Sequence, residues 1–213
     1  MKEKVIIFDF DGVLADSFDF FYSLNSEGMK HIGLSLTKKR YRDLFIGNIH
    51  QGFKDFINNG QKYPVFLKFK EENYDTNYYS AKNGVKLFSE APAFLKKISK
   101  KHILTVASSG RQKNVKVLLK EKGVKNLFGL ILADSSYSKE GMIKEILHKY
   151  QAHPGQTFFV TDTVGDLKTA KEFGLKTIAV IWGFHDKKTL MKAEPDYIAS
   201  DFKKLISELN TTT

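Results

Sequence analysis

The sequence predicts an α/β protein in which a parallel sheet carries helices on both faces, with a small α-helical domain inserted after the first strand. Short, unbroken apolar runs recur along the chain, as is typical of strands that are buried on both faces. Segments with helical spacing lie between these runs, and this alternation favours right-handed crossovers and a parallel sheet. The alternation is missing from residues 17–84, which indicates an insert of a different kind.

The apolar runs that we predict to be strands are residues 5–9, 103–108, 129–133, 157–161 and 177–181. Helices are expected over residues 91–100, 111–123, 139–150, 166–174 and 201–209. Gly123 and Gly174 close two of these helices, because glycine readily adopts the left-handed conformation that ends a helix. This order of elements predicts a Rossmann-like core.

The insert is expected to be a helical domain with its own core. Apolar residues recur at helical spacing over residues 19–33 and 36–47, and 14 of the 28 aromatic residues lie within residues 17–84. We therefore predict a core domain of residues 1–16 and 85–213, with the helical domain, residues 17–84, between its two parts.

Composition excludes several classes of protein. The chain has no cysteine, which excludes disulfides and thiolate metal sites and makes a cytoplasmic location the natural expectation. No apolar run approaches the length of a membrane span, and strand-like sequence begins at Val5, so neither a membrane segment nor a signal peptide is expected. The net charge of +10 is dispersed, and arginine occurs only at 40, 42 and 111, which favours a small anionic ligand over nucleic acid. The oligomeric state is not predicted.

Carboxylates are expected at the ends of two predicted strands, where ligands bind in an open parallel sheet. Asp9 ends the first apolar run, and Asp11 lies just beyond it. Asp162 ends the fourth run, with Asp166 one helical turn further on. Like charges so close repel, and burying them is costly unless a positive charge lies beside them. A turn would explain Asp11, and helix capping would explain Asp166, but neither explains an aspartate inside an apolar run.

A hydroxyl group and an amine are expected at the same edge of the sheet. Ser108 and Ser109 end the second run, and the residues alone do not choose between them. Lys139 begins the helix after the third run, whereas Lys144, the alternative, lies one turn further from the edge. Neither residue type carries much signal by itself, but with the carboxylates they form one group of polar side chains.

These motifs, in this order, closely resemble those of the haloacid dehalogenase (HAD) superfamily. The first motif is matched by Asp9-Phe10-Asp11-Gly12-Val13, the second by Ser108, the third by Lys139, and the fourth by Asp162 and Asp166. The resemblance covers essentially the whole chain, and residues 17–84 are similar to the helical cap of that family. Within the superfamily the sequence is most similar to the branch of phosphoglycolate phosphatases and β-phosphoglucomutases.

The resemblance implies a Mg²⁺-dependent phosphatase that acts on a small phosphorylated metabolite. Asp9 would attack phosphorus and form an aspartyl-phosphate, and Asp11 would protonate the leaving oxygen and then activate water. The carboxylates implied at the Mg²⁺ site are those of Asp9, Asp11, Asp162 and Asp166, the last in a supporting role. The residues implied in phosphate binding are Ser108 or Ser109, and Lys139.

Three alternatives to a phosphatase are weighed. A phosphomutase needs the same core, so only contacts from the cap and a product assay distinguish it. A dehalogenase expels a halide, which needs no proton, so Asp11 argues against it. A non-catalytic binding protein is expected to have lost Asp9 or Asp162, and both are present.

Two positions depart from the family pattern, and one segment is open to interpretation. Thr161 stands where relatives usually have glycine, and Glu140 where a proline often follows the lysine. Trp182-Gly183-Phe184 is predicted to be a turn with aromatic packing. The histidines have no metal-ligand spacing, and His185 is expected to be a surface or packing residue.

Overall fold

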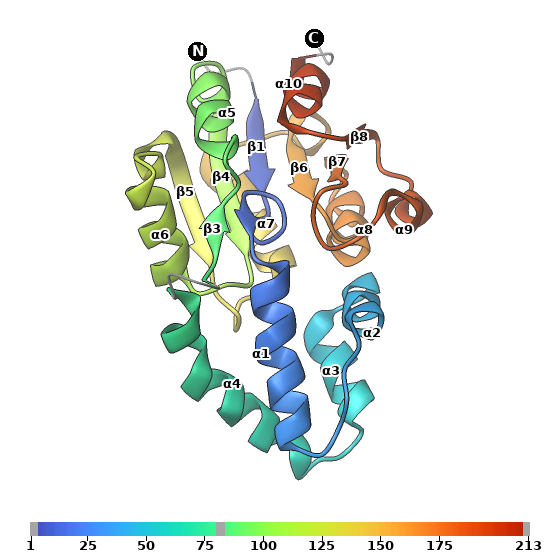
Figure 1. Ribbon diagram of the computed structural model, residues 1–213. Helices are drawn as coiled ribbons and strands as arrows, with labels where there is room; N and C mark the ends of the chain where they lie inside the picture. Colours follow the sequence, from blue (N-terminus) through green and yellow to red (C-terminus); the bar gives the residue numbers. More distant parts are fainter. Residues whose placement is uncertain (1–3, 80–83, 211–213) are drawn as a thin grey trace. The chain divides into compact units, whose positions relative to one another are not determined.

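The computed structural model describes residues 4–79 and 84–210, and the chain folds into two compact units (Figure 1). The sheet unit contains the residues up to Asp16 and those from Leu87 onward. The helical unit is Ser17–Lys86. Within the described ranges, no helix has both the length and the apolar content needed to cross a lipid bilayer.

The sheet unit is built on a parallel sheet in the order β5-β4-β1-β6-β7-β8. Its strands are β1 (Val5–Phe8), β4 (Ile103–Ser108), β5 (Phe128–Ala133), β6 (Phe158–Thr161), β7 (Lys176–Val180) and β8 (Tyr197–Ala199). Strand β1 lies in the interior of the sheet, between β4 and β6, so its carboxyl end lies beside theirs. This placement brings three chain segments that are distant in sequence to one edge.

Helices cover both faces of this sheet. They are α5 (Ala91–Ile98), α6 (Gln112–Glu121), α7 (Lys139–Tyr150), α8 (Val164–Glu172), α9 (Lys187–Leu190) and α10 (Phe202–Asn210), with 3₁₀ turns at Lys125–Leu127, Pro154–Gln156 and Met191–Ala193. Successive side chains of a strand point to opposite faces. Ile7 accordingly packs with residues of α7 and α8, whereas Phe8 packs edge-to-face on Phe94 of α5. Phe94 in turn packs against Phe202 of α10.

The predicted fold class is confirmed: an α/β core with a parallel sheet and helices on both faces, and a helical domain inserted after the first strand. Strand β8 was not predicted from the sequence. It spans only Tyr197–Ala199 and lies at the edge of the sheet, so it lacks the long apolar run by which the other strands were found.

The helical unit packs around aromatic side chains. Its elements are α1 (Phe18–His31), α2 (Lys38–Asp43), a 3₁₀ turn at Leu44–Ile46, α3 (Ile49–Ile57) and α4 (Lys62–Tyr78). Gly28 allows α1 to approach α4 closely, because a Cβ atom there would lie 3.0 Å from the ring of Phe66. Phe66 also contacts Phe53 of α3, with ring centroids 5.1 Å apart. The short strands β2 (Ala15–Asp16) and β3 (Lys86–Leu87) pair where the chain leaves and re-enters the sheet unit.

Candidate active site

The loop after β1 places Asp9 and Asp11 at the carboxyl end of an interior strand. Asp9 still follows the sheet, because its N–H donates to the carbonyl oxygen of Val160 at 2.9 Å. The chain then turns sharply at Gly12, whose φ of +75° is readily adopted only by glycine. A Cβ atom on Gly12 would also collide with the carboxylate of Asp162, so this tight loop and the end of β6 approach each other closely.

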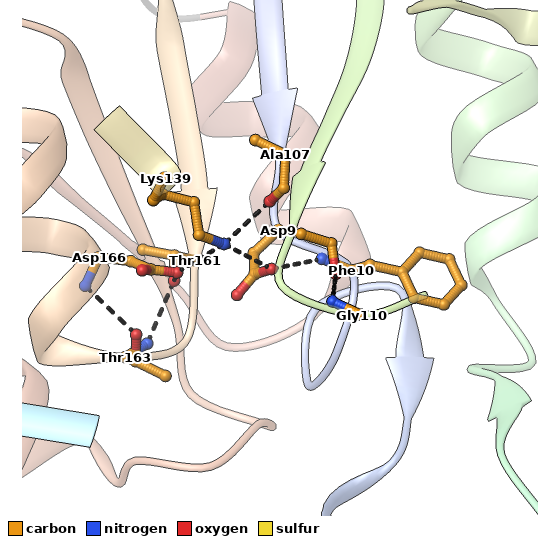
Figure 2. A network of polar contacts seen from close by, with 9 residues as sticks. Asp9, Phe10, Ala107, Gly110, Lys139, Thr161, Thr163 and Asp166 are labelled. Carbon is orange, nitrogen blue, oxygen red and sulfur yellow. Dashed lines mark hydrogen bonds and ion pairs between the residues drawn. The ribbon is translucent and has the colours of Figure 1, made fainter. Parts of the chain in front are cut away.

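Lys139, the first residue of α7, lies between two carboxylates (Figure 2). Its Nζ is 3.0 Å from Oδ1 of Asp9 and 3.1 Å from Oδ2 of Asp166, and it donates to the carbonyl oxygen of Ala107 at 2.9 Å. These three acceptors match the three N–H donors of an ammonium group. Oδ1 of Asp9 receives a second hydrogen bond from the N–H of Phe10 at 2.8 Å, so this oxygen is held by two donors.

Ser108 ends β4 on the adjacent side of Asp9. Its hydroxyl group is buried and accepts a hydrogen bond from the N–H of Gly110 at 3.0 Å, whereas Ser109 is exposed. A Cβ atom on Gly110 would lie 3.2 Å from both Oγ of Ser108 and Oδ2 of Asp11. The serine hydroxyl group and the Asp11 carboxylate therefore border the same small space.

Asp162 follows β6 and is fully buried. Its Oδ2 accepts a hydrogen bond from the N–H of Phe184 at 2.6 Å. Its Oδ1 is buried without a hydrogen-bond partner among the residues that the structure describes. A carboxylate oxygen in that position is costly unless a cation or a proton joins it.

Asp166 is held by the residues that precede it. Its Oδ2 accepts a hydrogen bond from Oγ1 of Thr161 at 3.3 Å, in addition to its ion pair with Lys139. Oγ1 of Thr161 in turn accepts from the N–H of Thr163 at 3.3 Å. Thr163, and not an aspartate, caps α8, since its hydroxyl group accepts from the N–H of Asp166. The threonine at the glycine position of the family thus supplies a contact that glycine cannot make.

The charges of this cluster do not balance by themselves. Burial raises the pKa of Asp9 well above its usual range, and the nearby charges of Asp166 and Asp162 raise it further, although Lys139 opposes the shift. Burial likewise raises the pKa of Asp162 to about 7. Burial disfavours the charge on Lys139, but Asp166 and Asp9 outweigh that effect and raise its pKa. One ammonium group therefore faces an excess of carboxylates.

The donor set fits a divalent cation of the Mg²⁺ type. Mg²⁺ prefers carboxylate oxygens and is usually held by one or two of them together with water and substrate phosphate. Asp9 and Asp162 offer such oxygens, and the free Oδ1 of Asp162 lacks only a positive partner. Among the described residues, no three carboxylate or histidine side chains form a complete metal cage, which is the usual situation for Mg²⁺.

Comparison with known proteins places this chain in a family. Residues 6–180 match the family model described as haloacid dehalogenase-like hydrolase. The chain belongs to the haloacid dehalogenase-like hydrolases. The matched region contains every site residue named above up to Asp166 and ends with β7.

Relatives of this HAD-like hydrolase match along almost its whole length. A phosphoglycolate phosphatase of Synechococcus elongatus is 23% identical, and the match covers 97% of this chain and 98% of the relative. A pyrophosphatase of Oceanobacillus iheyensis is 24% identical over 97% of both chains. The solved structure of a haloacid dehalogenase-like family protein from Streptococcus pneumoniae has a TM-score of 0.79 at 23% identity, covering 97% of this chain and 98% of that one. That likeness shows a shared fold.

The HAD-like fold brings together most of the side chains that the sequence singled out. Asp9, Lys139 and Asp166 are in direct contact, and Asp162 lies close enough to shift the pKa of Asp9. Ser109 differs, because its side chain is exposed while Ser108 is buried. The catalytic, phosphate-binding and metal-binding roles of these residues stay predictions.

Several contacts of this HAD-like site could not be found from sequence motifs. The backbone N–H groups of Phe10 and Phe184 bind the carboxylates of Asp9 and Asp162, and the carbonyl group of Ala107 binds Lys139. Every residue has such backbone groups, so the residue type carries no signal for them.

Proposed function

We propose that this HAD-like hydrolase is a phosphatase that hydrolyses a small soluble phosphomonoester through an aspartyl-phosphate on Asp9, with Mg²⁺ as its cofactor. The observation that carries the proposal is the environment of Asp9. Lys139 and the N–H of Phe10 both bind Oδ1, which fixes the orientation of this carboxylate at the end of β1. A carboxylate whose orientation is fixed through one oxygen can present the other oxygen to phosphorus as a nucleophile.

In the first half-reaction, Oδ2 of Asp9 attacks phosphorus, and the bond from phosphorus to the leaving oxygen breaks. Asp11 gives its proton to that oxygen, so the alcohol leaves as a neutral molecule. Ser108 donates the proton of its hydroxyl group to a phosphate oxygen, since the lone pair toward Gly110 is already occupied. Ser109 and nearby backbone N–H groups are the other candidate donors to the phosphate.

In the second half-reaction, Asp11 takes a proton from water, and the water oxygen attacks phosphorus. The bond between phosphorus and Asp9 breaks, which releases inorganic phosphate and restores both carboxyl groups to their starting states. Lys139 keeps the Asp9 carboxylate oriented and ionised before the first step, and it stabilises the carboxylate that forms again when the bond to phosphorus breaks in the second. It stands close enough to bind phosphate if it exchanges one partner.

Mg²⁺, when bound, supplies positive charge that offsets the repulsion between Asp9 and the phosphate dianion. Asp9 and Asp162 are the residues that would hold it, with Asp11 contributing and Asp166 in support. Asp166 acts indirectly because its Oδ2 is bound by Lys139 and Thr161.

The helical unit is proposed to be the cap that selects the substrate, as the family resemblance implies. The relatives named phosphoglycolate phosphatase and pyrophosphatase suggest the compounds to test first. We place the enzyme in the cytoplasm, in line with a chain that has no cysteine.

The test is a phosphate-release assay with phosphoglycolate, pyrophosphate, a set of sugar phosphates and p-nitrophenyl phosphate, each with Mg²⁺ and with a chelator. We expect Mg²⁺-dependent release by the wild type and a loss of at least about 10³-fold in Asp9→Asn, because an amide is a poor nucleophile. Asp134→Asn is the matched control, since Asp134 also follows a strand of the sheet but is exposed. Acid-quenched wild type should carry phosphate that hydroxylamine removes. Near wild-type turnover by Asp9→Asn would contradict the proposal.

A further inference from the structure

The segment Trp182–His185, which follows β7, binds Asp162 through backbone N–H groups of the segment. The N–H of Phe184 donates to Oδ2 of Asp162 at 2.6 Å, and the N–H of His185 donates to the carbonyl oxygen of the same aspartate at 3.2 Å. Gly183 is packed so closely that a Cβ atom there would collide with the Asp162 carboxylate. Two consecutive residues therefore hold both the main chain and the side chain of Asp162.

The imidazole group of His185 adds a third contact to this region. It is 2% exposed, and its Nδ1 accepts a hydrogen bond from the N–H of Val164 at 3.1 Å. Val164 is the first residue of α8, and the first N–H groups of a helix have no partner within the helix. A nitrogen that accepts a hydrogen bond carries no proton, so this contact requires an imidazole ring whose proton is on Nε2.

The three hydrogen bonds form a closed loop of contacts. Residues 184 and 185 bind Asp162 through their N–H groups, and the side chain of His185 binds the N–H of Val164, two residues after Asp162. The collisions that side chains at Gly12 and Gly183 would cause show that both glycines pack closely against the carboxylate. Oδ2 is consequently fixed by Phe184, and Oδ1 is left buried without a hydrogen-bond partner among the described residues.

We propose that His185 is a positioning residue: its Nδ1 anchors the segment Trp182–His185 to the start of α8, so that Oδ1 of Asp162 is presented to Mg²⁺. The inference rests on the proposed function, because it gives that Mg²⁺ site a further residue. It replaces the expectation that His185 is only a surface or packing residue. Residues that orient metal ligands typically change metal affinity by about 10–100-fold when they are removed.

The test compares His185→Asn with His185→Leu. The two side chains have similar size and shape, and Oδ1 of asparagine takes the place of Nδ1, whereas leucine has no acceptor. Mg²⁺ binding is measured by calorimetry without substrate, and Trp182, the only tryptophan, gives a fluorescence signal from the segment itself. We expect the Asn variant to bind Mg²⁺ within about threefold of the wild type and the Leu variant to bind it at least about tenfold more weakly.

Val164→Pro removes the same hydrogen bond by removing its donor, the N–H of residue 164. Proline is well tolerated at the first position of a helix, and the preceding Thr163 already has the extended conformation that proline requires. We expect this variant to weaken Mg²⁺ binding as His185→Leu does, and the double variant to be no weaker than either. Val164→Pro also tests the inference if His185→Leu does not fold.

Leu205→Ala, in α10, is the control for lost stability, because Leu205 is fully buried and outside the site. It should lower the melting temperature and leave Mg²⁺ affinity unchanged. Two outcomes would overturn the role of His185 and leave the proposed function standing. One is unchanged Mg²⁺ affinity in His185→Leu and Val164→Pro. The other is equal weakening of Mg²⁺ binding in His185→Asn and His185→Leu. A wild type that hydrolyses phosphoesters but neither binds nor needs Mg²⁺ would overturn the proposed cofactor together with this inference.

Discussion

Nζ of Lys139 lies 3.0 Å from Oδ1 of Asp9, although 130 residues separate them in the chain. Both side chains are nearly buried, with 12% and 10% of their surfaces exposed. A buried ion pair of this kind is costly to form, but removing one partner is worse because it leaves an uncompensated charge. This pair links the nucleophile proposed at β1 to the start of α7.

Lys139→Met should be destabilised by about 3–5 kcal/mol in the presence of a chelator, because Asp9 and Asp166 lose their shared cation. Mg²⁺ should reduce this loss, since it supplies positive charge to the same carboxylates. Urea unfolding of the wild type and the variant, with EDTA and with Mg²⁺, measures both effects. Lys68→Met is the control, because its ion pair with Glu72 is exposed and worth little. Equal stability of Lys139→Met and the wild type in EDTA would refute the prediction.

Asp11→Asn should affect the two half-reactions differently. An alkyl phosphate needs a proton on its leaving oxygen, so formation of the aspartyl-phosphate should slow by about 10²–10⁴-fold. p-Nitrophenolate leaves without a proton, so that step should slow much less with p-nitrophenyl phosphate. Breakdown should be slow with both, because the same water attacks. Rapid-quench kinetics should show a burst of p-nitrophenol followed by slow turnover.

Equal slowing of the first step with both esters, without a burst, would contradict the proposed role of Asp11 as acid in the first half-reaction and base in the second. In that case Asp11 would have only a structural role or only a metal-binding role, and it would not carry protons. Asp9→Asn is the reference variant, since it should show neither a burst nor turnover with either ester.

Thr161→Val should weaken the site, whereas Thr161→Ser should largely preserve it. The hydroxyl group of Thr161 donates to Asp166 and accepts from the N–H of Thr163, and valine removes both contacts without changing the shape. A buried N–H group left without its partner costs about 1–3 kcal/mol. We expect a lower kcat/KM and a lower unfolding midpoint for Thr161→Val. The hypothesis is wrong if the serine variant loses as much activity as the valine variant.

Lys70 should make the stability of the protein depend on alkaline pH. It is half-buried in α4, with Nζ 5.0 Å from the ring centroid of Phe53 and 5.3 Å from that of Phe66, and burial lowers its pKa from 10.5 to about 8. Between these values the unfolded chain binds more protons than the folded one, so this lysine contributes a stability that rises with pH from about 8 to 10.5.

Lys70→Met lacks this charge, so it should be more stable than the wild type at pH 7 and should lose that advantage toward pH 10. The measurement is the free energy of unfolding of both proteins in urea, from pH 7 to pH 10. The other lysines are the same in both proteins, so their contribution cancels in the difference between the two free energies. Parallel pH profiles would show that Lys70 keeps an ordinary pKa in the folded protein.

The fold class and the residue types of the site can be predicted from the sequence alone. The apolar runs that became β1, β4, β5, β6 and β7 are long and continuous, and this is a local pattern that can be read without any tertiary contact. Asp9 stands out because it ends such a run, where a buried carboxylate is costly without a positive partner. The family motifs then supplied the order of the remaining residues.

Which groups of the site meet, and through which atoms, depends on the tertiary fold. The residue type alone does not distinguish Ser108 from Ser109, but the end of β4 buries one and exposes the other. His185 is one of six histidines without a motif, and its role emerges because the chain after β7 returns to the start of α8. The physical reason is that hydrogen bonds and ion pairs depend on distances between segments remote in sequence, and the backbone donors involved belong to every residue alike.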